Sequence, residues 1–171
     1  MRRLVSIAAV LALAGCTPSP PPTAPPTPSA PPVAPVAVKS AVPGGCGDSP
    51  VWTGGLPEWT ASANAPSTRF VLSHEENLVG VLFAFPLRAQ PDPQGPNNKI
   101  LWIVREPRHG TPLRLTLHPM GSTGPTVEQE QPANSSPGEI YPSIVDVKGA
   151  GCWSVTARWA GKTATLELAY I

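Results

Sequence analysis

The three histidines carry the most versatile side-chain chemistry of this chain, because an imidazole titrates near neutral pH and can serve as a base or a metal ligand. His74 is followed by Glu75 and Glu76, which could place a base beside carboxylates. Since it lies between two strand-like runs, we interpret this segment as a solvated turn. His118 and Met120 have a spacing suited to copper, but the only other methionine is Met1, so no sulfur-rich copper site is expected.

Sequence motifs of several enzyme classes are missing from the 171 residues. The chain has no Gly-x-Ser-x-Gly, no His-Glu-x-x-His, no glycine-rich phosphate loop and no Cys-x-x-Cys. The scattered cysteines and histidines also lack the spacing of zinc ligands. We therefore predict no catalytic residue, metal or cofactor from the sequence, and a site assembled only by the fold stays open.

Trp52 and Trp59 flank a short stretch that contains glycine and proline. Two indole rings could form an exposed stacking surface for sugars or for the side chains of a partner. The alternative is that both rings pack one end of the fold, which we favour because the 5 Trp, 2 Tyr and 3 Phe must serve the whole domain.

Proline and glycine argue against helical architectures. The chain has 25 prolines and 15 glycines, and a proline inside a helix costs about 3 kcal/mol. Eleven prolines gather in residues 17–43, and the other 14 are scattered over 44–171. The formal net charge of +1 provides no basic field for nucleic acid. We expect a proline-rich linker followed by a strand-rich domain.

Short strand-like runs recur through the second part of the chain. The stronger runs are 69–73, 78–85, 99–105, 112–118, 152–160 and 163–170, and the weaker are 51–53, 126–131 and 143–147. Apolar and polar residues alternate in several of them, and Gly161 suits a tight turn between the last two. The fold prediction is an all-β, immunoglobulin-like β-sandwich of about seven to nine strands, with a small β-barrel as the alternative.

The amino terminus predicts export and attachment to a membrane. Arg2 and Arg3 precede an apolar run that is too short to span a bilayer, and the run ends at Leu13-Ala14-Gly15-Cys16. This ending resembles the lipobox of bacterial lipoprotein signal peptides. The resemblance implies cleavage before Cys16, acylation of its sulfur and anchoring of the domain on the extracytoplasmic side. Residues 1–15 would be the signal peptide, 16–43 the lipidated linker and 44–171 the domain.

With Cys16 used by lipid, Cys46 and Cys152 remain as an even pair in an exported domain. We predict a disulfide between them, which would join the start of the domain to its last hairpin. Two unpaired thiols are the alternative.

A second resemblance covers much of residues 44–171. The segments 85–88, 98–105, 141–147 and 151–153 are similar to blocks of uncharacterised exported proteins of high-GC bacteria, a group whose function is not known. These blocks fit shared architecture as well as a shared site. If a site exists, its polar candidates are Arg88, Asn98, Lys99 and Asp146.

Two functional hypotheses follow from the sequence. The first is a lipid-anchored envelope protein whose immunoglobulin-like domain is non-catalytic and binds a protein partner or a cell-wall component. The second is an envelope enzyme or accessory subunit. A pocket that holds His74, His109 or His118 beside a carboxylate would favour the second hypothesis.

Overall fold

A computed structural model describes residues 38–60, 67–90 and 93–171 of the chain. Cys16, the signal segment 1–15 and the linker up to residue 37 lie outside the described residues. No helix in the described ranges is long and apolar enough to cross a bilayer.

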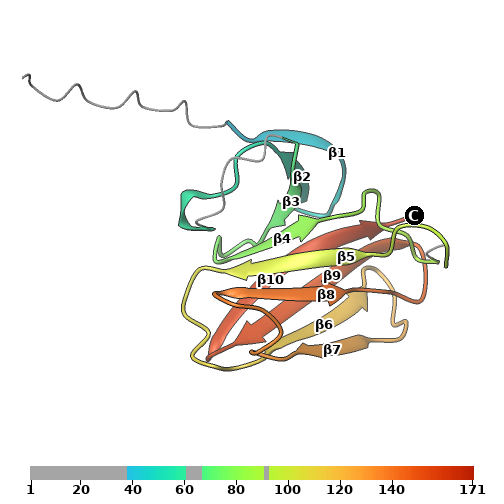
Figure 1. Ribbon diagram of the computed structural model, residues 1–171. Helices are drawn as coiled ribbons and strands as arrows, with labels where there is room; N and C mark the ends of the chain where they lie inside the picture. The colour runs from blue at the N-terminus through green and yellow to red at the C-terminus, as the bar shows by residue number, and fades with distance from the viewer. Residues whose placement is uncertain (1–37, 61–66, 91–92) are drawn as a thin grey trace, which may run out of the picture. The chain divides into compact units, whose positions relative to one another are not determined.

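The described part of the chain forms two antiparallel sheets that pack face to face (Figure 1). One sheet has six strands in the order β1-β2-β3-β4-β5-β8, and the other has four in the order β10-β9-β6-β7. The elements are β1 (Ser40–Cys46), β2 (Ser49–Thr53), the 3-10 helix η1 (Glu58–Thr60), β3 (Arg69–Leu72), β4 (Leu78–Leu82), β5 (Lys99–Val104), β6 (Leu113–Pro119), β7 (Val127–Gln131), β8 (Ile140–Ile144), β9 (Gly151–Trp159) and β10 (Lys162–Tyr170).

The predicted β-sandwich is confirmed, and the two sheets do not close into one barrel. Each of the six stronger strand predictions corresponds to an observed strand, with ends that differ by up to three residues. The structure has more strands than predicted because β1 begins at Ser40, inside the expected linker. Strand β8 also starts at Ile140, earlier than the predicted run 143–147.

The core lies between the sheets and follows the alternation of the strands. Leu113, Leu115 and Leu117 of β6 are buried, as are the alternate positions of β9 and β10. Trp102 of β5 is fully buried, and its Nε1 donates a hydrogen bond to Ser143 Oγ at 2.8 Å. Gly80 makes room for this ring, because a Cβ there would lie 2.8 Å from the Trp102 side chain.

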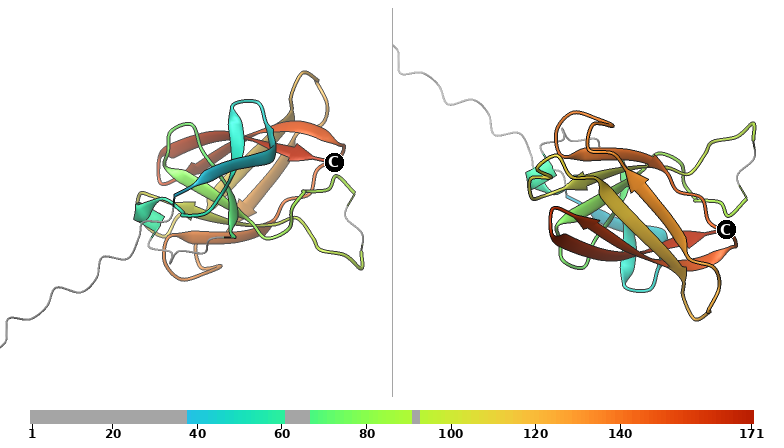
Figure 2. Two further views of the ribbon diagram at one scale, coloured as in Figure 1. Left: turned by 90° about the horizontal axis from the view of Figure 1, so that it is seen from above. Right: turned by 90° about the horizontal axis from the view of Figure 1, so that it is seen from below.

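The predicted C-terminal hairpin is confirmed. β9 and β10 pair over their whole lengths, and Figure 2 shows these two strands, in orange and red, running side by side across the domain. Ala160 and Gly161 form the turn with φ of 42° and 75°. Two successive residues with positive φ match the twist of the strands, as in tight hairpins of the I′ type.

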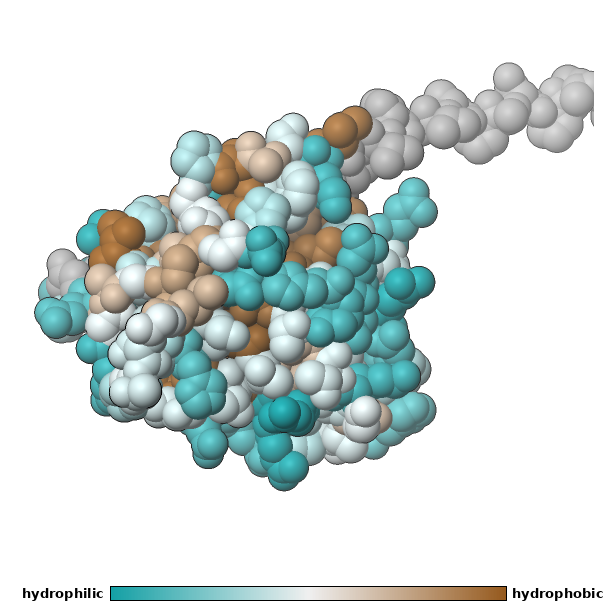
Figure 3. Space-filling view, turned by 180° about the vertical axis from the view of Figure 1, so that it is seen from behind, coloured by the Kyte–Doolittle hydropathy of each residue, from teal (hydrophilic) through white to brown (hydrophobic). Residues whose placement is uncertain are grey.

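A second apolar cluster lies on the outer face of the six-stranded sheet. Phe70, Val79, Val81 and Ile103 are buried there, with partly buried apolar side chains packed against them. Elsewhere the surface is mixed, and in the space-filling view from behind, apolar side chains appear in separate places between polar ones (Figure 3).

The two cysteines of the domain are free thiols, so the predicted Cys46–Cys152 disulfide is not present in the structure. Both are half-buried, and they are neighbours. Burial, and next a hydrogen bond and charge interaction with Cys152, raise the pKa of the Cys46 thiol to about 12. In this reduced form the Cys46 thiol is therefore protonated at neutral pH and is a poor nucleophile on its own.

Candidate functional site

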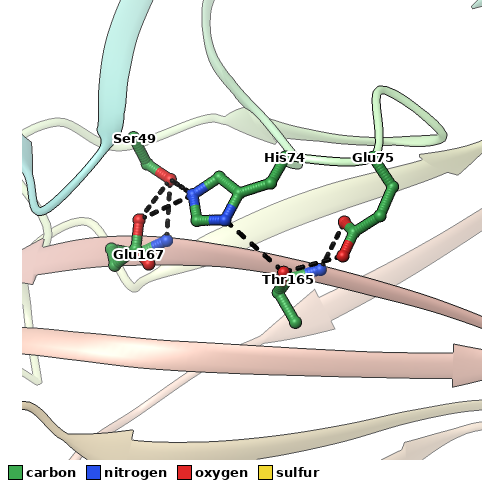
Figure 4. A network of polar contacts seen from close by, with 5 residues as sticks. All are labelled: Ser49, His74, Glu75, Thr165 and Glu167. Atoms are coloured by element: carbon green, nitrogen blue, oxygen red, sulfur yellow. Dashed lines mark hydrogen bonds and ion pairs between the residues drawn. The ribbon is translucent and has the colours of Figure 1, made fainter.

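Among the described residues, the largest group of interacting polar side chains lies along the free edge of β10 (Figure 4). Ser49 begins β2, His74 and Glu75 lie in the turn between β3 and β4, and Thr165 and Glu167 belong to β10. The turn thus meets a strand that lies 90 and 91 residues later in the sequence, and Ser49 of β2 meets the same strand across 118 residues.

Ser49, His74 and Glu167 lie within hydrogen-bonding distance of one another. Ser49 Oγ donates to Glu167 Oε2 at 2.7 Å and accepts the Glu167 backbone N–H at 2.9 Å. His74 Nε2 lies 3.0 Å from the same carboxylate oxygen and 3.3 Å from Ser49 Oγ. Ser49 is 1% exposed, whereas the His74 side chain is 39% exposed.

These three residue types could form a serine, histidine and acid triad, but their arrangement differs from one. In a triad the nucleophile and the acid contact opposite ring nitrogens of the histidine. Here both Ser49 and Glu167 approach Nε2, and Nδ1 faces Thr165 Oγ1 at 3.5 Å. The Ser49 proton is directed to Glu167, so the imidazole is not placed to remove it from a nucleophile.

The same groups satisfy the free edge of β10. Thr165 N–H donates to Glu75 Oε2 at 2.7 Å, and Thr165 O accepts from His74 N–H at 2.9 Å. Thr163 O accepts from Asn77 Nδ2 at 3.2 Å. Unpaired edge groups are a template for aggregation in β-proteins. The arrangement therefore acts as a clamp, which we call the β10 clamp, and it joins the two sheets.

Glu75 is the member of the β10 clamp whose ionisation is perturbed. Burial opposes its charged form, but hydrogen bonds from the backbone N–H and the hydroxyl of Thr165 outweigh burial and lower the carboxyl pKa below its ordinary value. The hydroxyl bond to Oε1 is 2.8 Å long. The clamp is therefore strongest when Glu75 is ionised.

The other histidines lie apart from this cluster. His118 of β6 lies 3.1 Å from Thr126 Oγ1 through its Nδ1, and His109 occupies an exposed loop position with φ of 48°. Among the described residues, no three His, Cys, Asp or Glu side chains are grouped so that they could hold a metal ion.

Three of the four predicted polar candidates come together. Asn98 is 1% exposed, and its Oδ1 accepts the Arg88 N–H at 2.9 Å. Its Nδ2 donates to Arg88 O at 2.7 Å and to Asp146 Oδ1 at 2.8 Å. Arg88 is held through its backbone, so the group braces a loop. Lys99 points elsewhere, with its Nζ 4.9 Å from the centre of the Phe83 ring.

Trp52 and Trp59 both lie on the outer face of the six-stranded sheet, half-buried against the second apolar cluster. The Lys39 ammonium is 4.6 Å from the Trp52 ring centre. Trp59 borders an open groove of about 380 Å³, together with Leu56 and Leu72. The rings therefore pack on the sheet and keep part of their surface accessible.

Ser49, Thr165 and Glu167 were not among the predicted site residues, although all three lie close to His74. The alternation of β10 indicates that Thr165 and Glu167 share its outer face, but no local signal shows that the 73–77 turn reaches that edge.

Comparison of the sequence with family models and with curated proteins, and of the fold with solved structures, finds no match.

Proposed function

We propose that this protein is anchored on the extracytoplasmic side of a bacterial membrane through lipid on Cys16, and that its β-sandwich is a non-catalytic module that binds a protein partner. The observation that carries the binding function is the partly exposed apolar face of the six-stranded sheet.

This face presents side chains that soluble proteins usually cover. Its buried centre, with Phe70 and Ile103, is surrounded by apolar side chains that remain partly accessible, and Phe83 and Ile144 are 59% and 47% exposed. The accessible positions are Trp52, Leu56, Trp59, Leu72, Phe83, Leu101, Ile140 and Ile144. Clustered exposed apolar side chains often mark interaction sites.

The charges around the Trp59 groove favour a protein over a glycan. Lys39 and Arg105 lie on its border together with Glu58 and Glu76. An apolar centre with a polar rim is the usual anatomy of a protein interface, and a rim with both charge signs selects a partner with the complementary pattern.

The sequence supports the anchoring function, because the lipobox resemblance comes before a proline-rich segment. Runs of proline favour the extended polyproline II conformation, which spaces a domain away from its anchor. Several acyl chains together hold a protein stably at a membrane, whereas one chain holds it marginally.

Replacing Cys16 tests the anchor. We expect Cys16→Ala to abolish incorporation of a labelled fatty acid and to prevent cleavage before residue 16, because both steps need the thiol. Cys46→Ala is the matched control and keeps the label. Labelled Cys16→Ala protein would contradict the proposal.

Photocrosslinking in intact cells tests the binding face. A photoreactive residue at Leu101 is expected to give a discrete protein adduct, and one at Thr156, on the other sheet, is not. The adduct should disappear in Ile144→Asp and persist in Ile171→Asp, which also alters an exposed isoleucine. Adducts with glycan only, or adducts insensitive to Ile144→Asp, would refute a protein partner at this face.

We also propose that Cys46 and Cys152 are joined after export. The step removes two protons and two electrons, which pass to a disulfide of an envelope thiol oxidase as that disulfide becomes two thiols. The neighbouring positions of the thiols support this proposal. Protein isolated without reductant should take up no alkylating reagent in denaturant, and uptake at both cysteines would contradict it.

A further inference from the structure

The outer face of the four-stranded sheet differs in character from the apolar face. On β6, Arg114 lies between the buried Leu113 and Leu115, and on β9, Arg158 lies between the buried Ala157 and Trp159. Both arginines therefore point away from the core and are exposed.

The strand register sets these two arginines side by side. Arg114 of β6 is directly opposite Arg158 of β9. Side chains in directly opposite positions have Cβ atoms about 4.5–5.5 Å apart, and like charges there repel. Such a pair destabilises the sheet when no anion is close, and a neighbouring negative charge would relieve the repulsion between the two guanidinium groups.

Only one of the two arginines forms an ion pair with a carboxylate among the described residues. Arg114 Nε donates to Glu130 Oε2 at 2.7 Å, with both side chains mostly accessible to solvent. No described residue forms an ion pair or a side-chain hydrogen bond with Arg158, or with Lys162 at the start of β10. Arg158 and Lys162 thus have no ion-pair partner among the described residues, and two carboxylates, Glu128 and Glu130 of β7, border the adjoining groove with both arginines.

These cations border an open hollow of about 500 Å³. Its other walls include Pro112 and Ala160, which are apolar, and Thr163, which is directly opposite Arg158 in the strand register. The hollow is large enough for a phosphate group with part of a chain on either side.

We propose that Arg114, Arg158 and Lys162 bind a phosphodiester of an anionic envelope polymer. A guanidinium donates through a planar fork that matches phosphate oxygens, and a lysine adds a compact charge. An extended ligand would continue on the β9 and β10 side, over Thr156 and Thr163, because Glu128 of β7 is opposite Thr116 and Glu130 is opposite Arg114. The site is on the other sheet from the apolar face and does not depend on it.

Binding of a glycerol-phosphate oligomer to the full-length chain in neutral detergent tests this site. We expect Arg158→Gln with Lys162→Gln to weaken binding by about tenfold or more, because charge-assisted hydrogen bonds are lost. Arg88→Gln with Lys148→Gln removes the same charge from exposed positions elsewhere and should change binding less than about twofold. The unfolding temperature checks that each variant is folded.

Two further ligands identify the source of the anion. A uronic acid oligomer of equal length carries carboxylates, and vesicles with anionic phospholipid carry phosphate headgroups. The proposal requires the glycerol-phosphate oligomer to bind more tightly than either. Equal weakening in the control variant, absence of binding, or stronger binding to uronic acid or vesicles would each overturn it.

Discussion

Asn98 shows how one buried amide can hold a loop through three hydrogen bonds. It accepts one hydrogen bond from Arg88 and donates one to Arg88 O and one to Asp146. A carboxylate in its place would have only acceptors, and it would face both a carbonyl oxygen and another carboxylate.

We therefore predict that Asn98→Asp destabilises the domain by about 3 kcal/mol at neutral pH. The loss should be smaller in acid, because a protonated aspartic acid regains one donor. Denaturant unfolding at two pH values measures both effects. Asn97→Asp, at an exposed neighbouring position, is the control and should change little. An equal loss at both pH values would contradict this account.

Gly80 gives a second prediction at the residue scale. A methyl group there would lie 2.8 Å from the Trp102 ring and 3.1 Å from Val71, and both side chains are fully buried. Gly80→Ala should therefore cost about 1–3 kcal/mol. Gly149→Ala introduces the same group where no atom lies within 4 Å and should be nearly neutral. Equal unfolding free energies for both variants would show that Trp102 adjusts.

At the residue scale, the sequence indicated which side chains lie together better than it indicated what those side chains do. Arg88, Asn98 and Asp146 do meet, but Lys99 does not join them. Successive residues of a strand point to opposite faces, so a buried Asn98 sends Lys99 outward. The two thiols are adjacent, yet no spacing rule could give the protonation state of Cys46, which depends on burial.

At the scale of the elements, the tight turn of the C-terminal hairpin contains a strained backbone conformation that a substitution can relieve. Ala160 has φ of 42°, a conformation that costs a residue with a Cβ about 1 kcal/mol or more. Asparagine tolerates this region and precedes glycine in tight hairpin turns. Ala160→Asn should raise the unfolding free energy by about 0.5–1 kcal/mol. Gly161→Ala, where φ is 75°, should lower it, and stabilisation by both changes would refute the explanation.

The β3–β4 turn makes the stability of the sandwich depend on acid pH. The pKa of Glu75 is lowered in the folded state, so its contribution is present above the ordinary carboxyl pKa and disappears as the pH falls through the folded value. Glu75→Gln should flatten that part of the stability profile. Glu76→Gln removes the adjacent, exposed carboxylate and should leave the profile unchanged. If the unfolding free energy of Glu75→Gln decreases in acid over the same pH range as that of the wild type, the result would contradict the role of the β10 clamp.

Strand prediction succeeded where apolar residues alternate or follow one another without a break, as in β4, and it missed β1, where they do neither. β6, β9 and β10 bury every second residue, so their faces were predictable. β1 contains Pro43 and two glycines and has a register irregularity. Such a sequence does not look like a strand, but an edge strand tolerates proline because one side needs no ladder hydrogen bond. The β10 clamp was not predictable because its partners are distant in sequence.

For the whole molecule, the two sheets present different surfaces. The outer face of the six-stranded sheet is largely apolar, and the outer face of the four-stranded sheet carries arginine, threonine and the two glutamates of β7. Alternation predicts which side of β6 and β9 is polar, whereas the outer apolar cluster results from strands that are apolar on both faces, such as β4. The two proposed binding sites therefore lie on different sheets, and their ligands would not compete.

The global stability of the reduced domain should also fall at alkaline pH. The thiol pKa of Cys46 is raised from 9.0 to about 12 by burial and by Cys152. Above pH 9 the unfolded state loses its proton while the folded state keeps it, so stability decreases until the folded thiol titrates. Burial also raises the phenol pKa of Tyr170, which extends the loss at still higher pH.

Comparing reduced protein, oxidised protein and Cys46→Ala separates these contributions in urea unfolding curves. Cys46→Ala removes the thiol, so its unfolding free energy should not decrease from pH 9. The decrease at higher pH that comes from Tyr170 should remain. Oxidised protein, with no thiol to titrate, should follow the variant. If all three profiles decline alike from pH 9, the Cys46 thiol is not a source of the alkaline loss.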